Sequence, residues 1–221
     1  MQPRMTFAGF PEQALVFYEG LRADNTKAYW SDHRPTYDSC VKAPMEALLA
    51  QLEPEFGAAK FFRPYRDVRF AKDKTPYKDH AAAVVLGDDP GDGALYVQLS
   101  ADGLYVGGGY WHTQTDQARR LRAAIADDLT GAALARILDD LADWDVHGER
   151  LKRLPKEYAG HRRADLLHSK SLALTRAFAP AEWLHEPECG QRVAECWRAV
   201  GPLNDWLRSH VGATRRPAPA R

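Results

Sequence analysis

The chain has 221 residues, a length that suits one domain or slightly more. It is 45% hydrophobic and 27% charged, which is ordinary for a globular protein, and its 30 Lys and Arg residues balance 30 Asp and Glu residues. A formal net charge of zero excludes binding to nucleic acid through a uniformly basic surface, although it is compatible with a local basic patch. No stretch approaches the roughly 18 apolar residues of a membrane span, and the first residues lack the apolar core of a signal peptide. We therefore expect a cytoplasmic protein that has no membrane partner.

Cysteine and histidine give no sign of a disulfide framework or a metal centre. The three cysteines, Cys40, Cys189 and Cys196, form no short-range pattern, and no Cys-x-x-Cys or His-x-x-x-His pair occurs. We expect no metal and no cofactor. The patterns for an ordinary serine hydrolase and for the common phosphate-binding loops are also missing.

The first 55 or so residues predict helices. Phe10-Pro11-Glu12 is typical of a helix start, and Asn25 or Thr26 suits the cap of a second helix. From residue 37 to 52, apolar side chains recur at spacings of three and four, which predicts an amphipathic third helix. Pro44 lies within that pattern and predicts a kink or a break.

The middle of the chain predicts strands. Residues 61–70 are rich in aromatic side chains and indicate extended chain, and residues 81–86 form a short apolar run. Apolar and polar side chains alternate on both sides of Asp102-Gly103, which predicts a hairpin at about 94–111.

Helices return after this hairpin. The remaining segments with a pattern are helices at 116–127 and 134–141, one or two strands within 144–154, a helical turn at 163–168, and an ambiguous helix or strand at 171–178. The last helix is expected from about Gln191, with an interruption at Pro202.

Helices at both ends and strands between them favour an α+β fold rather than a strictly alternating one. We expect a single domain over residues 5–211, with a central, mostly antiparallel sheet flanked by N-terminal and C-terminal helices. Residues 212–221 contain too few apolar side chains to pack and are expected to form a flexible tail.

One segment concentrates positive charge. Residues 60–80 contain seven Lys and Arg side chains and three Asp side chains, so seven minus three leaves a local charge of +4. Residues 87–103 contain four Asp side chains and no Lys or Arg. The positive charge is therefore local, and its own acidic residues are too few to neutralise it.

Strand geometry predicts how some of these side chains meet. Along a strand, alternate residues share a face, so Asp67 and Arg69 lie on one side, roughly 6.5–7 Å apart at their Cα atoms. Val68 and Phe70 lie on the other side and are expected to face the core, with Arg66 partly covered beside them.

Two interpretations of this basic segment remain open: a salt-bridge network that holds strands in register, and a site for an anionic ligand. In the second, the anion-binding residues are Arg63, Arg66, Arg69, Lys72, Lys74 and Lys78. Orienting or pocket-lining roles fall to Asp67 and Tyr77, and to Gly108 and Trp111 in and after the Gly107–Gly109 triplet, which allows close approach of backbone or ligand.

Several segments resemble a widespread family of conserved hypothetical proteins, domain of unknown function 2461. The most specific is Arg-Asp-Val-Arg-Phe-Ala-Lys-Asp-Lys-Thr-Pro-Tyr-Lys at 66–78, and others are Phe7-Ala-Gly-Phe, Asn25-Thr-Lys-Ala-Tyr-Trp, Tyr96-Val-Gln-Leu-Ser and Ala164-Asp-Leu-Leu. The resemblance spans about residues 5–211. It supports the fold and the basic segment but implies no reaction.

We therefore expect a protein that binds a small phosphate- or carboxylate-bearing ligand through the basic segment, with no reaction identified. A first alternative is a nucleic-acid-binding module, because the basic residues are interleaved with Phe61, Phe62, Tyr65, Phe70 and Tyr77. A second is a structural or interaction protein whose charges stabilise the fold. The sequence does not indicate an oligomeric state.

Overall fold

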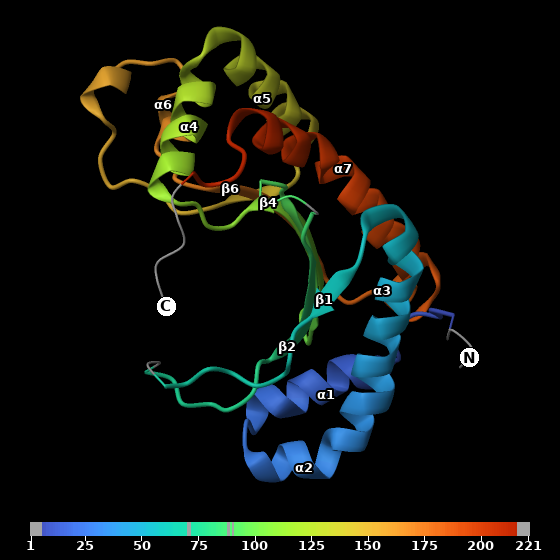
Figure 1. Ribbon diagram of the computed structural model, residues 1–221. Coiled ribbons are helices and arrows are strands. Elements are labelled where there is room, and N and C mark those ends of the chain that lie inside the picture. The colour runs from blue at the N-terminus through green and yellow to red at the C-terminus, as the bar shows by residue number, and fades with distance from the viewer. Residues whose placement is uncertain (1–5, 70–71, 88, 90, 216–221) are drawn as a thin grey trace. The chain divides into compact units, whose positions relative to one another are not determined.

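The computed structural model describes residues 6–69, 72–87, 89 and 91–215 of the chain (Figure 1). Within these residues, six strands form one antiparallel sheet in the order β1-β2-β3-β4-β6-β5, with helices from the N-terminal and C-terminal segments beside it. The predicted α+β class is therefore confirmed.

The elements have the following bounds. The helices are α1 (Glu12–Ala23), α2 (Lys27–Thr36), α3 (Ala43–Phe56), α4 (Thr115–Ala126), α5 (Asp128–Asp140), α6 (Ala164–Leu167) and α7 (Glu188–His210). A π-helical turn, η1 (Tyr37–Lys42), joins α2 to α3, and two short 3₁₀ turns are η2 (Lys156–Tyr158) and η3 (Glu182–His185). The strands are β1 (Ala59–Phe61), β2 (His80–Val85), β3 (Ala94–Ser100), β4 (Gly103–Tyr110), β5 (Asp145–His147) and β6 (Leu172–Phe178).

The described chain divides into two compact units. The first contains the residues up to Val85 together with Tyr96–Val106 and Ala177–Glu195. The second contains Leu86–Leu95, Gly107–Arg176 and the residues from Cys196 onward. The predicted boundaries of one domain over residues 5–211 stay a prediction.

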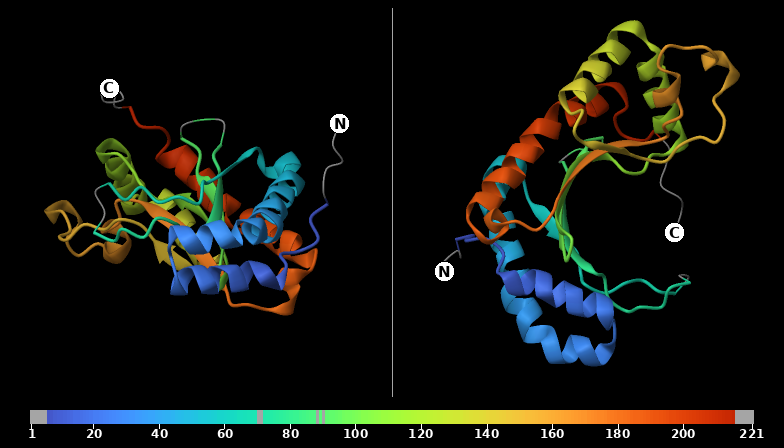
Figure 2. Two further views of the ribbon diagram at one scale, coloured as in Figure 1. Left: turned by 90° about the horizontal axis from the view of Figure 1, so that it is seen from below. Right: turned by 180° about the vertical axis from the view of Figure 1, so that it is seen from behind.

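Helices α1, α2 and α3, the blue helices of the ribbon, belong to the first unit (Figure 2), and local chemistry sets where they start. Pro11 precedes α1, and the hydroxyl of Thr26 caps α2 by accepting a hydrogen bond from the Tyr29 backbone N–H at 3.2 Å. Pro44 predicts a kink or a break; the helical chain does not break there, since α2, η1 and α3 follow without a gap, but the π-helical turn η1 departs from a regular α-helix just before it. Pro44 itself occupies the first turn of α3, where its missing N–H costs little.

Aromatic side chains form much of the core of this unit. The ring of Phe17 contacts Tyr18, Trp30 and Tyr37 at centroid distances of 5.1, 5.8 and 5.6 Å. The other flank of Trp30 stacks on Tyr77 at 4.3 Å, with the two ring planes 8° apart. This stack fixes the segment after residue 70 against α2, and so sets the position of the basic residues.

The predicted hairpin is confirmed as β3 and β4. Gly103 has a φ of +100°, a conformation that residues with a side chain rarely adopt, and a Cβ there would lie 2.2 Å from the carbonyl oxygen of Phe178. At the same turn Asp102 makes a two-pronged ion pair with Arg22 of α1, with N–O distances of 3.0 and 2.6 Å. Turn chemistry and one ion pair therefore hold this end of the hairpin.

The Gly107–Gly109 triplet lies within β4 in the second unit. A Cβ on Gly107 would stand 2.6 Å from the carbonyl oxygen of Leu174, and one on Gly109 would stand 2.5 Å from that of Leu172. The missing side chains let β4 lie close to β6, so the triplet serves strand packing in this part of the molecule.

The structure corrects one expectation and settles another. Helix α7 begins at Glu188 and continues through Pro202 to His210, so the predicted interruption is wrong. Buried side chains on both sides of the proline, Val200, Leu203 and Leu207 among them, keep the helix in place although one backbone hydrogen bond is lost. The ambiguous segment 171–178 forms strand β6.

The first residues of the predicted tail contact α4. Gln117 donates a hydrogen bond to the carbonyl oxygen of Gly212 at 2.8 Å, and Asp116 accepts one from the backbone N–H of Arg215, also at 2.8 Å. Residues 216–221 lie outside the described residues.

Candidate functional site

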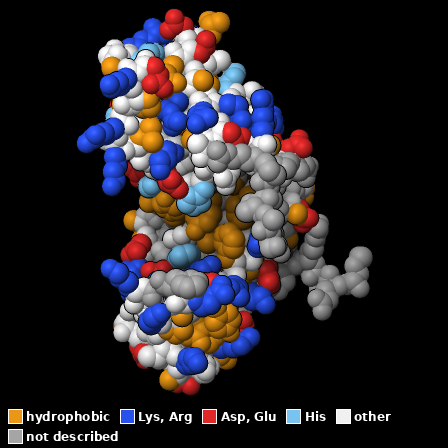
Figure 3. Space-filling model, turned by 60° about the vertical axis from the view of Figure 1, so that its left-hand side comes forward, with side chains coloured by type: hydrophobic (Ala, Val, Ile, Leu, Met, Phe, Trp, Pro, Cys, Tyr) orange, Lys and Arg blue, Asp and Glu red, His pale blue; other side chains and the backbone are white. Residues whose placement is uncertain are grey.

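The basic segment forms an extended two-stranded arm, here residues 62–79 without 70 and 71, which leaves the sheet between β1 and β2 (Figure 1). Its two sides pair antiparallel at Tyr65 and Tyr77. The Arg66 N–H donates to the carbonyl oxygen of Pro76 at 2.9 Å, and the Lys78 N–H donates to that of Pro64 at 2.8 Å. Figure 3 shows Lys and Arg side chains gathered beside hydrophobic ones on this end of the molecule.

Asn25, in the loop between α1 and α2, anchors the arm. Its side-chain amide donates to the carbonyl oxygen of Tyr77 at 3.0 Å and accepts from the backbone N–H of the same residue at 3.1 Å. Because the pair copies the pattern of a strand ladder, Asn25 replaces a neighbouring strand at this position. Together with the Trp30 stack, it determines where Lys78 and the residues beside it lie.

Asp67 and Arg69 meet, as the strand spacing predicts. The Arg69 guanidinium donates to both carboxylate oxygens of Asp67, at 2.9 and 2.7 Å, and its backbone N–H donates at 3.3 Å. Hydrogen bonding from Arg69 lowers the pKa of Asp67 to about 2. Arg69 is therefore engaged by the protein's own carboxylate. Val68 is half-buried, and Phe70 lies outside the described residues.

Arg66 bridges the two sides of the arm. Its Nη1 atom donates to the carboxylate of Asp73 and to the hydroxyl of Thr75, while its Nε and Nη2 atoms make no hydrogen bond to any described residue. The Thr75 backbone N–H and Arg66 lower the pKa of Asp73 to about 2. Lys74 donates to the carbonyl oxygen of Val68 at 2.9 Å.

Three of the six predicted anion-binding residues thus contact groups of the protein itself: Arg66, Arg69 and Lys74. Arg63 and Lys72 are exposed and make no hydrogen bond or ion pair with the described part of the chain. Lys78 is different, because its ammonium lies over the ring of Phe62 at 5.0 Å from the centroid and faces no acidic partner among the described residues.

A cavity of about 450 Å³, here called the arm pocket, lies between the arm, the end of α1 and the start of β2. The residues that line it are Arg22, Asn25, Arg66, Asp73, Thr75, Tyr77, Lys78, Asp79 and His80. Partial burial, and after it the charge of Arg63, lowers the pKa of Lys78 below its ordinary value of 10.5. Asp79 is 2.8 Å from Nδ1 of His80, so both acids of the cavity have partners.

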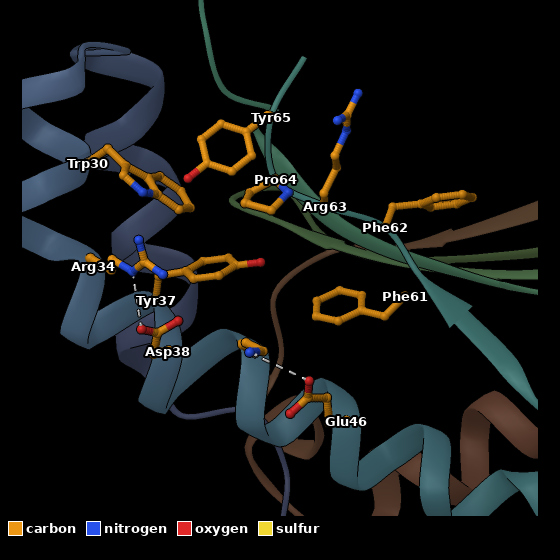
Figure 4. A pocket seen from close by; sticks show the side chains of 11 residues that line it. Trp30, Arg34, Tyr37, Asp38, Glu46, Phe61, Phe62, Arg63, Pro64 and Tyr65 are labelled. Atoms are coloured by element: carbon orange, nitrogen blue, oxygen red, sulfur yellow. Dashed lines mark ion pairs between the residues drawn. The ribbon is translucent and has the colours of Figure 1, made fainter. Parts of the chain in front are cut away.

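A second cavity of about 350 Å³, the aromatic pocket, lies between the α2–α3 helices and the segment after β1 (Figure 4). The residues that line it are Trp30, Arg34, Tyr37, Asp38, Lys42, Glu46, Phe61, Phe62, Arg63, Pro64 and Tyr65. Arg34 is 3.5 Å from Asp38, and Lys42 is 3.9 Å from Glu46, one helical turn apart in each case. The two cavities share no lining residue.

The predicted site residues Gly108 and Trp111 lie in the second unit and line neither cavity. A Cβ on Gly108 would meet Cγ1 of Val200 at 2.6 Å, so the protein's own side chain occupies that space. Tyr77 lines the arm pocket, whereas Asp67 lies outside both linings.

The sequence did not identify Asn25 and Trp30 as residues that line these cavities. Asn25 and Tyr77 are 52 positions apart, and Trp30 reaches Tyr77 over a similar separation. Asn25 and Trp30 both belong to the segment Asn25-Thr-Lys-Ala-Tyr-Trp, whose residue types indicate the start of a helix. They do not indicate that this helix contacts Tyr77.

Metal-binding clusters and membrane-spanning helices are both absent from the described residues. These residues include no group of three or more His, Cys, Asp or Glu side chains arranged to hold a metal ion. Within the same ranges no helix combines the length and the apolar character needed to cross a membrane.

Comparison with known proteins assigns the family. The family model described as DUF2461, conserved hypothetical protein, matches residues 13–206, so the chain belongs to this family. Neither the curated proteins nor the solved structures gave a match.

Proposed function

We propose that the protein binds a small anion bearing a phosphate or carboxylate group in the arm pocket, with Lys78 as the principal contact. The observation that carries the proposal is a partly desolvated ammonium that lines a cavity and has no acidic partner among the described residues. A cation in this position is held at a cost, since burial and Arg63 both disfavour its charge. A bound anion removes that cost.

Arg66 supplies further donors. Its contacts with Asp73 and Thr75 use only Nη1, and these contacts hold the guanidinium in one orientation. The side chain is about one-third exposed, at 33%, and its Nε and Nη2 atoms remain available as a forked pair, the geometry that matches a carboxylate or a phosphate.

The acidic residues of the pocket limit the size of the anion. Arg22, Arg66 and Lys78 outnumber Asp73 and Asp79 by one in the lining, but Arg22 is also paired with Asp102, so of these three cations Lys78 alone has no acidic partner among the described residues. Asp73 is occupied by Arg66 and Thr75, and Asp79 by His80. One ammonium without an acidic partner suits one small anionic group better than a polyanion.

The test is calorimetric titration with inorganic phosphate and with acetate at constant ionic strength, on the wild-type chain and on Lys78→Gln. A hydrogen bond to a charged group is worth about 1.5–3 kcal/mol, so Lys78→Gln is expected to weaken binding roughly tenfold or more. Lys72→Gln is the matched control, because this exposed lysine loses the same charge outside the cavity. Equal weakening by both variants, or no binding of either anion by the wild type, contradicts the proposal.

A second candidate function, binding of single-stranded nucleic acid, has one observation in its favour. Exposed residues alternate along the first side of the arm and place Tyr65, 44% exposed, between Arg63 and Arg69. Bases stack on such aromatic side chains while cations follow the phosphates. If this is the function, affinity for an oligonucleotide falls steeply as salt rises and Tyr65→Ala weakens it. Salt-insensitive or undetectable binding removes this candidate.

A further inference from the structure

The aromatic pocket differs from the arm pocket in its chemistry. Five of its lining residues are aromatic: Trp30, Tyr37, Phe61, Phe62 and Tyr65. Figure 4 shows Phe61 and Tyr65 extending from the strand side toward the helix side, where Trp30 and Tyr37 lie. Trp30 contacts both Tyr37 and Tyr65, at centroid distances of 4.8 and 6.1 Å, so the space for a flat ligand lies between Tyr37 and Phe61.

Tyr37 brings a hydroxyl group to the lining of the aromatic pocket. The residue is only 4% exposed, and its hydroxyl makes no hydrogen bond to any described residue. Figure 4 shows this ring directed from η1 into the space facing Phe61. The hydroxyl is not among the atoms that are cut off from solvent, so water reaches it in the cavity. A hydrogen-bond acceptor on a ligand would take the place of that water and keep the donor paired.

The charges around the pocket argue against a cationic ligand. The pairs Arg34–Asp38 and Lys42–Glu46 cancel each other's charge, and Arg63 adds one further cation to the lining. Burial, followed by Asp38 and Glu46, raises the pKa of Tyr37 to about 12. The hydroxyl therefore keeps its proton at neutral pH and acts as a donor.

We infer that the aromatic pocket binds an uncharged planar heteroaromatic ring whose acceptor atom takes a hydrogen bond from the Tyr37 hydroxyl. The site shares no lining residue with the arm pocket, so the inference stands apart from the proposed anion binding. A fused two-ring system fits within the volume of about 350 Å³.

The test compares three probes of nearly identical shape: quinoline, which has a ring acceptor, naphthalene, which has none, and the N-methylquinolinium cation. Dissociation constants come from protein-observed NMR titrations at neutral pH. One neutral hydrogen bond predicts that the wild type binds quinoline roughly two- to tenfold tighter than naphthalene. Tyr37→Phe should remove that preference and leave the affinity for naphthalene unchanged.

The control variants separate this role from a general effect on the fold. Tyr158→Phe removes a hydroxyl in the second unit and should keep the preference for quinoline. Lys72→Gln, at an exposed lysine that lines neither cavity, should leave the binding of both rings as in the wild type. Phe61→Leu removes one aromatic wall and should weaken the binding of quinoline and of naphthalene to a similar extent. This variant provides a second test if Tyr37→Phe does not fold.

Three results overturn the inference. They are the absence of binding by both neutral rings, a preference for quinoline that persists in Tyr37→Phe, and tighter binding of N-methylquinolinium than of quinoline. The last result would identify an aromatic cage for cations, in which ring faces rather than the hydroxyl hold the ligand.

Discussion

Asn25 offers the sharpest test of how the arm is positioned. Its side chain makes both of its hydrogen bonds to the backbone of Tyr77, at 3.0 and 3.1 Å, in a partly buried place. At about 0.5–1.5 kcal/mol for each bond, Asn25→Ala should lower the free energy of unfolding by about 2 kcal/mol. For a chain of this length, that corresponds to a fall in Tm of about 4–8 °C.

Asn25→Asp separates the two bonds. The carboxylate still accepts from the Tyr77 N–H but can no longer donate to its carbonyl oxygen, so about half of the loss is expected. The assay is urea denaturation followed by circular dichroism, with midpoint and slope both fitted. A loss below about 0.5 kcal/mol in Asn25→Ala, or an equal loss in both variants, refutes the view that this amide holds the arm.

The remaining predictions concern acid stability and two glycines. The pKa values of Asp67 and Asp73 lie near 2 in the folded chain, below the ordinary 3.8, so their contribution to stability is present above about pH 4 and lost as pH falls toward 2. Replacing both with Asn should flatten the decline in urea midpoint between pH 4 and pH 2, and an unchanged slope contradicts this. Gly201→Ala should bring less than the usual helix gain of about 0.5–1 kcal/mol in thermal melts, because the added Cβ has open space around it but lies next to the ring of Pro202 in helical conformation. Gly108→Ala should lower it by about 1–3 kcal/mol because the new Cβ overlaps Val200, and a neutral effect would show that β4 can shift.

Features that depend on neighbours in sequence could be predicted. The hairpin follows from alternation on both sides of Asp102-Gly103, and the start of α2 follows from the capping preference of Thr26. The ion pair of Asp67 with Arg69 follows from two-residue strand spacing. Each rests on interactions within a few residues, where backbone geometry alone sets the distances.

Features that depend on tertiary packing could not be predicted from the sequence. Pro202 reads locally as a helix break, but buried side chains before and after it keep α7 continuous. The triplet around Gly108 was read as a candidate pocket element, whereas β6 and Val200 take up the space beside it.

The same limit applies to the site. The sequence located the cationic residues but could not show which of them the protein itself engages. The side chains of Arg69 and Lys74 donate hydrogen bonds to groups of the arm. The ammonium of Lys78 instead lies over the ring of Phe62, and the residue lines the arm pocket. Formal charge counts do not resolve this difference, because it depends on side-chain direction and burial. For the aromatic pocket, the sequence shows the aromatic side chains at 61–70 but not their meeting with Trp30 and Tyr37, since η1 and the segment after β1 meet only in the folded chain.

The pKa of Lys78, measured by NMR with selectively labelled lysine side chains, tests the central claim most directly. Without ligand it should lie below 10.5, because burial and Arg63 oppose its charge. Saturating inorganic phosphate should raise it, since an anion beside the ammonium favours the charged form. The account would be contradicted if phosphate left the pKa of Lys78 unchanged, or if it shifted the pKa of the exposed Lys72 by the same amount.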